Sequence, residues 1–362
     1  MSNNKGKISL KQAVLLFIVL FCAPSIRFMA SYTAPISKQA SWLVPFVSMF
    51  FYIILILVIY KIFKKYDKES FVEIMQDILG KKIGGILIFL FFLAISFDLS
   101  YNIRIFSERL LGSVIPNIDI IVIIGAILAL TFYILKDGIV PLARMNEIFL
   151  IFIILILVIS TILVLPNLDV SNLFPITYKD IVPVFNANIG IVAIFSYITV
   201  FFMFSDKIVD RKDFKKISVK LILALTIISL IAIACPIGVF GWSLVSKMPI
   251  PFINTVMEIS FFDTIERIEA FVVMFWILAD FVSICVLTYS AIHIISVYFK
   301  INKTNSVLSI YIVSMFFMSL CIAKSTVELN ALSKYVIVPL NIVMGYFIPI
   351  IVLIVGKVRK KI

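Results

Sequence analysis

Three ionisable side chains, Arg27, Asp98 and Asp280, stand inside long apolar stretches of the sequence. A charged group in such a stretch is costly in a bilayer unless it is paired or hydrated, so each one marks a candidate functional site. Arg27 is the cation that we expect to meet one of the two carboxylates. The resulting pair can bind a ligand or can hold helices together without one, and the sequence leaves both interpretations open.

Polar side chains accompany both carboxylates. They are Ser96, Ser100, Tyr101 and Asn102 around Asp98, and Trp276 and Ser283 around Asp280. Helix-breaking and polar residues also interrupt two apolar stretches. They are Ala23, Pro24, Ser25 and Arg27 in the first, and Pro183, Asn186, Asn188 and Gly190 at the start of the other, which continues through Ser196, Tyr197 and Thr199. Discontinuous helices at equivalent positions of two halves bind substrate in transporters built from inverted repeats.

We therefore expect unwound backbone at Ala23–Arg27 and at Asn186–Ile191 to hold a small ligand, because freed backbone groups must find new partners. The side chains of Asp98, Tyr101, Asn102, Asp280 and Ser283 would frame that ligand. A simple proline kink in the first stretch and an ordinary polar helix start in the second are the alternative.

The elements that carry these residues are predicted to be membrane-spanning helices. The chain of 362 residues is 62% hydrophobic and only 14% charged, with a mean hydropathy of +1.16, which excludes a soluble protein. Windows of about 20 apolar residues predict ten spans in a single domain covering residues 1–362. The predicted spans are Gln12–Tyr32, Trp42–Ile62, Ile83–Leu111, Ile118–Leu135, Val140–Leu165, Ala187–Phe204, Ile217–Trp242, Ile265–Phe299, Ser306–Ala323 and Lys334–Val355.

The charge distribution orients these spans. Most of the 32 Lys and Arg residues fall in alternate loops, as expected for loops on the cytoplasmic side, so both termini are predicted to be cytoplasmic. The net charge of +12 is explained by this topogenic signal, and we expect no nucleic-acid partner. The segment Phe63–Lys82 has apolar residues at helical spacing and predicts a short amphipathic helix on the cytoplasmic surface.

Several other patterns argue against enzymatic chemistry. Nucleophile-elbow, zinc-protease, phosphate-loop and dinucleotide motifs are absent from the sequence, so we predict no enzyme and no cofactor. His293 is the single histidine and the four cysteines are dispersed, so we predict no metal site. Arg104 and Glu108 are spaced for an ion pair within one helix.

Four segments of the sequence are similar to those of a known family. They are Lys38-Gln39-Ala40-Ser41-Trp42-Leu43, Asn172-Leu173-Phe174-Pro175-Ile176, the run from Asn254-Thr255 through Ile259-Ser260, Phe262-Asp263 and Glu266–Glu269 to Trp276, and Gly345-Tyr346-Phe347-Ile348-Pro349. On these segments the chain resembles the spore germination permeases along nearly its whole length. It differs from the family pattern in its first span, where Arg27 lies inside a stretch expected to be uncharged and Ala30 replaces an expected proline.

The resemblance implies an all-α membrane protein of the amino acid-polyamine-organocation superfamily. Its LeuT-like fold would have a 5+5 inverted repeat with helices one and six interrupted, the first repeat covering about residues 12–165 and the second about 187–355. It also implies the B subunit of a nutrient germinant receptor in the inner membrane of a dormant spore, with an A subunit and a lipoprotein C subunit as partners. A small nutrient, commonly an amino acid, would bind between helices one, three, six and eight.

Two other functions remain open from the sequence. The chain could be an amino-acid secondary transporter that couples uptake to a proton or cation gradient through Asp98 or Asp280. It could also be a scaffold or an ion-conducting component without a ligand pocket.

Overall fold

The computed structural model describes residues 6–66, 69–113, 115–210, 213–258 and 268–362. The described residues form a helical bundle with one two-residue parallel strand pair, β1 (Ile8–Ser9) with β2 (Ile208–Val209). The helices of the first half are α1 (Leu10–Ser37), α2 (Val44–Lys65), α3 (Phe71–Leu79), α4 (Lys81–Ser113), α5 (Ile120–Leu135) and α6 (Ile139–Val164).

The second half begins after a loop of short 3-10 turns. Its helices are α7 (Ile181–Phe195), α8 (Ile198–Met203), α9 (Phe214–Val245), α10 (Pro251–Met257), α11 (Ile268–Tyr298), α12 (Thr304–Cys321), α13 (Thr326–Leu332), α14 (Val338–Ile342) and α15 (Ile348–Val358). Two π-helical segments, Ser333–Ile337 and Val343–Phe347, join α13, α14 and α15. The start of the eighth predicted span, Ile265, lies outside the described residues.

Eight segments of the described chain are long and apolar enough to cross a membrane. The first of them, Leu10–Lys65, includes both α1 and α2, and α5 is a shorter apolar helix. Many large apolar side chains on these helices face outward, such as Ile151 on α6 and Ile310 on α12, as lipid contact requires. The protein is therefore a multi-pass membrane protein.

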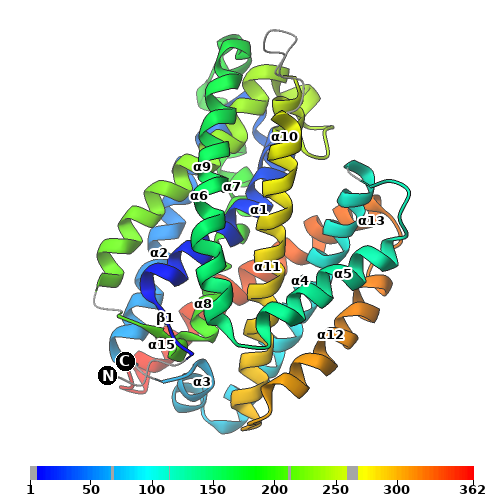
Figure 1. Ribbon diagram of the computed structural model, residues 1–362. Coiled ribbons are helices and arrows are strands. Elements are labelled where there is room, and N and C mark those ends of the chain that lie inside the picture. The colour runs from blue at the N-terminus through cyan, green and yellow to red at the C-terminus, as the bar shows by residue number, and fades with distance from the viewer. Residues whose placement is uncertain (1–5, 67–68, 114, 211–212, 259–267) are drawn as a thin grey trace.

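Helix α1 runs through the middle of the bundle and packs against α6, α7, α9 and α11 (Figure 1). The prediction that this helix is interrupted is wrong, because α1 is helical from Leu10 to Ser37 with Pro24 inside it. Neighbouring helices and hydroxyl side chains can keep a proline-containing membrane helix intact. The Ser25 hydroxyl donates to the Phe21 carbonyl over 2.5 Å, and Ala23 and Ser25 are almost completely buried.

The interruption of the sixth predicted span lies later than the sequence predicts. Asn186–Ile191 is part of α7, whereas the chain turns at Ser196 and Tyr197, between α7 and α8. The backbone there tightens instead of unwinding: Tyr197 N–H donates to the Ile194 carbonyl over 3.2 Å. Gly345 packs directly on this turn, and a Cβ atom at Gly345 would overlap Ser196 Cβ. Helix interfaces in membranes use small residues for such close approach.

The amphipathic segment forms α3, but its apolar face does not lie on the membrane surface. The helix begins at a capping box in which Ser70 and Glu73 bond reciprocally. Its apolar side chains, including Ile74, Met75 and Ile78, are fully buried against α4, α8, α11 and α15. The predicted amphipathic helix is therefore confirmed, and its apolar face packs within the protein.

Two of the family-like segments contact one another at the end of the molecule away from β1 and α15. Gln39 Nε2 donates to the Pro175 carbonyl over 3.0 Å, and Trp42 Nε1 donates to the Leu173 carbonyl over 3.3 Å. Asn172 Nδ2 extends this contact by donating to the Gly238 carbonyl in α9 over 3.0 Å. The turn after α1 is thereby fastened to the loop before α7.

Candidate functional site

A chain of polar contacts joins the three ionisable residues that the sequence singles out. Arg27 Nη1 in α1 lies 3.7 Å from Asp280 Oδ1 in α11, and Arg27 Nη2 donates to Asn102 Oδ1 in α4 over 3.4 Å. Asn102 Nδ2 donates to Asp98 Oδ1 over 3.2 Å, and Tyr197 OH donates to the same oxygen over 3.1 Å. We call these five residues the charged network.

The charged network is deeply buried and connects elements that are far apart in the sequence. None of its five side chains belongs to a residue more than 8% exposed. It ties α1 to α4, to α11 and to the turn between α7 and α8. In a low-dielectric interior such contacts fix the relative positions of the helices, because leaving one partner unpaired is costly.

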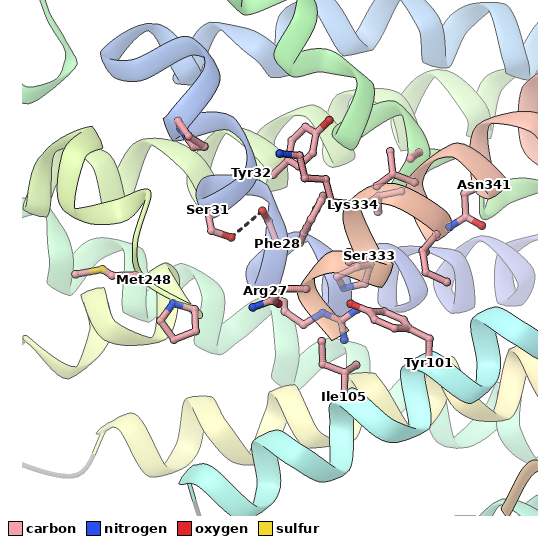
Figure 2. Close-up of a pocket in the computed structure, with 18 of the residues that line it drawn as sticks. Arg27, Phe28, Ser31, Tyr32, Tyr101, Ile105, Met248, Ser333, Lys334 and Asn341 are labelled. Atoms are coloured by element: carbon pink, nitrogen blue, oxygen red, sulfur yellow. Dashed lines mark hydrogen bonds between the residues drawn. The ribbon is translucent and has the colours of Figure 1, made fainter. Parts of the chain in front are cut away.

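A cavity of about 530 Å³ lies on one side of the charged network, and we call it the binding cavity. Arg27, Tyr101 and Tyr197 line it at the network, whereas exposed Lys247 and Lys334 lie at its rim. Figure 2 shows Arg27 beside Tyr101, with Ser31, Tyr32, Ser333 and Lys334 around the same space. Its walls come from α1, α4, α7, the turn after α7, the loop before α10 and the segment from α13 to α14.

The lining combines cations, aromatic rings and small polar groups. The cations are Arg27, Arg109, Lys247 and Lys334, and no Asp or Glu is among the described lining residues. The rings of Phe28 and Tyr32 lie 4.8 Å apart between centroids. A concave site of this size with a few convergent polar groups is suited to a small organic ligand.

Gly190 contributes to the binding cavity indirectly. A Cβ atom at Gly190 would lie 2.5 Å from the Tyr32 ring, so only glycine lets this ring pack on α7. Tyr32 itself lines the cavity. Gly190 itself is not among the lining residues, so the structure places it in support of a lining side chain, and its role in holding a ligand stays a prediction.

The other predicted site residues divide into three groups. Pro24, Arg27 and Tyr101 line the binding cavity, while Asp98, Asn102 and Asp280 stand behind it in the charged network. Outside both are Ala23, Ser25, Asn186, Asn188, Ile191 and Ser283.

Four of the residues outside the cavity either form hydrogen bonds within the helix bundle or face outward. Ser25 and Ser283 donate their hydroxyls to carbonyls of their own helices. Asn188 accepts a hydrogen bond from Ser48 in α2, and Asn186 is exposed on α7. These contacts explain why polar residue type alone does not place a side chain at the site.

Sequence reasoning did not include Tyr197, Arg109, Lys247 and Lys334 in the site. Tyr197 follows the predicted interruption, and its position in a polar run was the available signal. The three cations lie near the ends of spans, where snorkelling to the membrane surface is the ordinary explanation for a basic residue. Only the tertiary fold shows that they face a common space.

A second polar contact, which is partly buried, lies toward the C-terminal end of α11. His293 Nε2 is 2.7 Å from Asp206 Oδ1, so the single histidine has a carboxylate partner. Burial raises the pKa of Asp206, but its hydrogen bond with His293 and the nearby charges more than offset this effect, and the pKa lies below its ordinary value. The predicted pair of Arg104 and Glu108 is confirmed, with Nη2 and Oε1 2.7 Å apart.

Comparison with solved structures identifies the fold. The crystal structure of MhsT in complex with L-phenylalanine superposes with a TM-score of 0.71 at 12% identity, covering 98% of this chain and 99% of that one. A substrate-bound, outward-open Na⁺-coupled sialic acid symporter gives a TM-score of 0.59 at 14% identity, covering 94% and 80%. The protein therefore has an all-α, LeuT-like fold.

Comparison of sequences identifies the family. Spore germination protein KB of Bacillus subtilis (strain 168) is 23% identical over 99% of this chain and 98% of its own length. Spore germination protein YndE of the same organism is 23% identical over 100% and 99%. The family model for spore germination proteins named spore permease matches residues 7–327. This chain belongs to the spore germination permease family.

Proposed function

We propose that this protein is the B subunit of a spore nutrient germinant receptor and that it binds a small nutrient in the binding cavity. The observation that carries the proposal is the 530 Å³ cavity, because it is bounded by α1 and by α7, the first helices of the two halves, and reaches the buried charged network. Family membership supplies the link to germination, and the LeuT-like fold supplies a scaffold that accommodates small ligands at this depth.

The same proposal includes the division of the chain into two repeats and its orientation in the membrane. The chain would be one domain of two repeats, about residues 12–165 and 187–355, crossing the inner membrane of the spore ten times with both termini in the cytoplasm. The alternation of basic loops supports this orientation. The binding cavity would then face outward, because its rim residues Lys247 and Lys334 lie in segments assigned to the outer side.

The charged network offers a route from ligand binding to a signal. A ligand can shift a conformational equilibrium only by the difference between its affinities for the two states. Arg27, Tyr101 and Tyr197 line the cavity, and two of them belong to the network that joins α1, α4, α11 and the turn after α7. A ligand contacting them would favour one arrangement of these helices, and the A subunit and lipoprotein C subunit would detect it.

Filling the cavity tests the proposal. Ser31 lines the cavity and is half-buried, so Ser31→Phe adds an aromatic ring where the ligand is expected. Spores carrying this variant should need at least about tenfold more nutrient for half-maximal loss of optical density. Val158→Phe adds similar bulk on an outward face of α6, 46% exposed, and is the matched control. An unchanged dose response in Ser31→Phe spores with normal receptor abundance would refute the proposal.

The transporter alternative has one observation in its favour. Asp98 and Asp280 are buried carboxylates beside the cavity, and such groups carry coupling ions or protons in many transporters. Sustained accumulation of an amino acid by proteoliposomes containing only this chain, dependent on a proton or Na⁺ gradient, would favour transport. Binding without accumulation would favour the receptor.

A further inference from the structure

We propose that the binding cavity accepts a small organic anion, such as a carboxylate, and rejects an ammonium group. The inference rests on the proposed function, since it names the chemical class of the ligand for the same cavity. It departs from the expectation of an amino acid, whose ammonium group needs a partner as much as its carboxylate does.

The charged side chains that face the cavity all have the same sign among the described residues. Arg27, Arg109, Lys247 and Lys334 line it, and no carboxylate does so among the described residues. Two of these cations come from the membrane-embedded part of the bundle, and the other two come from the rim. Clefts lined by one sign of charge and walled by low-dielectric material concentrate ions of the opposite sign.

The carboxylates of the charged network are already engaged on the far side of the lining. Asp280 lies 3.7 Å from Arg27, and Asp98 accepts hydrogen bonds from Asn102 and Tyr197. Neither carboxylate lines the cavity. Asp280 thus already has a partner among the lining cations, and the exposed lysines Lys247 and Lys334 place two further positive charges at the cavity.

Free backbone carbonyls are the other kind of group that could hold an ammonium group. A helix that unwinds beside a ligand offers several free carbonyls, but α1 is helical from Leu10 to Ser37. Pro35 has no N–H to bond the Ser31 carbonyl, and both residues line the cavity. The Ser31 carbonyl and the neutral side-chain oxygens of the lining, such as those of Asn330 and Asn341, suit a hydroxyl or a water molecule, whereas an ammonium group there would face the repulsion of the cations.

The anion itself would find donors at the buried end and apolar surface along the sides. Arg27 provides a planar set of N–H donors that matches a carboxylate, and its Cζ lies 6.0 Å from the centroid of the Tyr101 ring. Ile105, Ile194 and Ile337 add apolar walls. Figure 2 shows Arg27 and Lys334 on the wall of the same space, so a small anion would lie between cations from α1 and from the segment after α13.

Charged thiol reagents measure this preference without a known ligand. Ser31→Cys places a thiol on the cavity wall, and it is combined with Cys321→Ser because Cys321 is exposed whereas Cys22, Cys235 and Cys285 are buried. The full-length variant in nanodiscs is treated with sulfonatoethyl, trimethylammonioethyl or methyl methanethiosulfonate. Each rate is divided by the rate of the same reagent with 2-mercaptoethanol.

We expect the anionic reagent to react at least about tenfold faster than the cationic one after this correction, with the neutral reagent between them. Lys334→Gln combined with Lys247→Gln should reduce that ratio severalfold, because both lysines are exposed at the rim and their loss leaves the buried network intact. A corrected ratio of one or less, or a ratio that the two substitutions leave unchanged, would overturn the inference.

The same Ser31→Cys variant separates this inference from the proposed function. If the ratio favours the anion but spores in which the introduced thiol has been modified germinate normally, the cavity is anion-selective and the proposed receptor site is wrong. If modification of that thiol blocks germination while the ratio is one, the receptor site stands and the anion preference is wrong.

Discussion

Arg27 Nη1 in the middle of α1 lies 3.7 Å from Asp280 Oδ1 in α11, and both residues are at least 95% buried. This contact joins the first helix of one half of the protein to the core of the other. It also places Arg27 where it both lines the binding cavity and holds the charged network together.

Removing one partner of this pair should cost much more than removing both. Asp280→Asn leaves the Arg27 charge buried without its carboxylate, and Arg27→Gln does the reverse, each with an expected loss of about 3–5 kcal/mol. The double variant Arg27→Gln/Asp280→Asn should be less destabilised than the sum of the two. Unfolding of the purified protein in detergent measures all four stabilities.

The control for this cycle is the exposed ion pair of Lys361 and Asp77, where the same kind of cycle should give about 0–1 kcal/mol. If the effects of Arg27→Gln and Asp280→Asn simply add, to within about 0.5 kcal/mol, the two residues are not energetically coupled.

The charges in apolar stretches were sufficient to predict that Arg27 meets a carboxylate, but the sequence could not choose between Asp98 and Asp280. The choice depends on tertiary contacts: Asn102 and Tyr197 bond Asp98 Oδ1, and the cation meets Asp280. The positions of the spans are likewise predictable from the lengths of the apolar stretches, because the thickness of the bilayer sets these lengths.

The breaks in the helices were not predictable from residue type. Pro24 suggests an unwound segment, yet packing around α1 keeps it helical. The turn at Ser196 and Tyr197 packs closely against Gly345, which comes from a distant part of the chain. The cations of the cavity were missed for a similar reason, since only the fold brings Lys247 and Lys334 to one space.

Loss of the Tyr197 hydroxyl should weaken the response to nutrient. Tyr197→Phe removes a hydrogen bond to a carboxylate in the charged network, an interaction of about 1.5–3 kcal/mol, while the ring remains. We expect the nutrient concentration for half-maximal germination to rise by about 10- to 100-fold.

Tyr311→Phe is the matched control for Tyr197→Phe. It removes the hydroxyl of another buried tyrosine, which forms a hydrogen bond of 2.9 Å with Ser96 Oγ. Neither residue lines the cavity. Equal shifts of the dose response in both variants would mean that the effect is structural and that the network does not transmit ligand binding.

A methyl group at Gly345 should displace the segment before α15 from the turn after α7. In Gly345→Ala the new Cβ would overlap Ser196 Cβ, and such overpacking costs about 1–3 kcal/mol. Gly125→Ala in α5 meets only a Phe316 ring carbon at 3.9 Å and should be neutral or slightly stabilising. Thermal unfolding in detergent distinguishes the two variants, and equal midpoints would contradict the close approach of Gly345 to the turn.

Attachment of the C-terminal residues to α3 should depend on the ionised form of Asp77. Hydrogen bonds from Lys361 Nζ (2.7 Å) and Tyr66 OH (2.6 Å) lower the pKa of Asp77 below its ordinary value. Because the pKa of Asp77 is lower in the folded state, its stabilisation of the folded state is complete above its unfolded pKa of about 4. That stabilisation is lost as the pH falls through the lower pKa of the folded state.

At neutral pH, Asp77→Asn imitates the protonated state and should accelerate tryptic cleavage after Lys357 and Arg359 severalfold. The acceleration should be partial, because Arg359 Nη1 still donates to the Ile78 carbonyl over 2.9 Å. Asp137→Asn, in an exposed turn between α5 and α6, changes the same charge elsewhere and serves as the control. Cleavage at the same rate in both variants would show that Asp77 does not hold the C-terminal residues on α3.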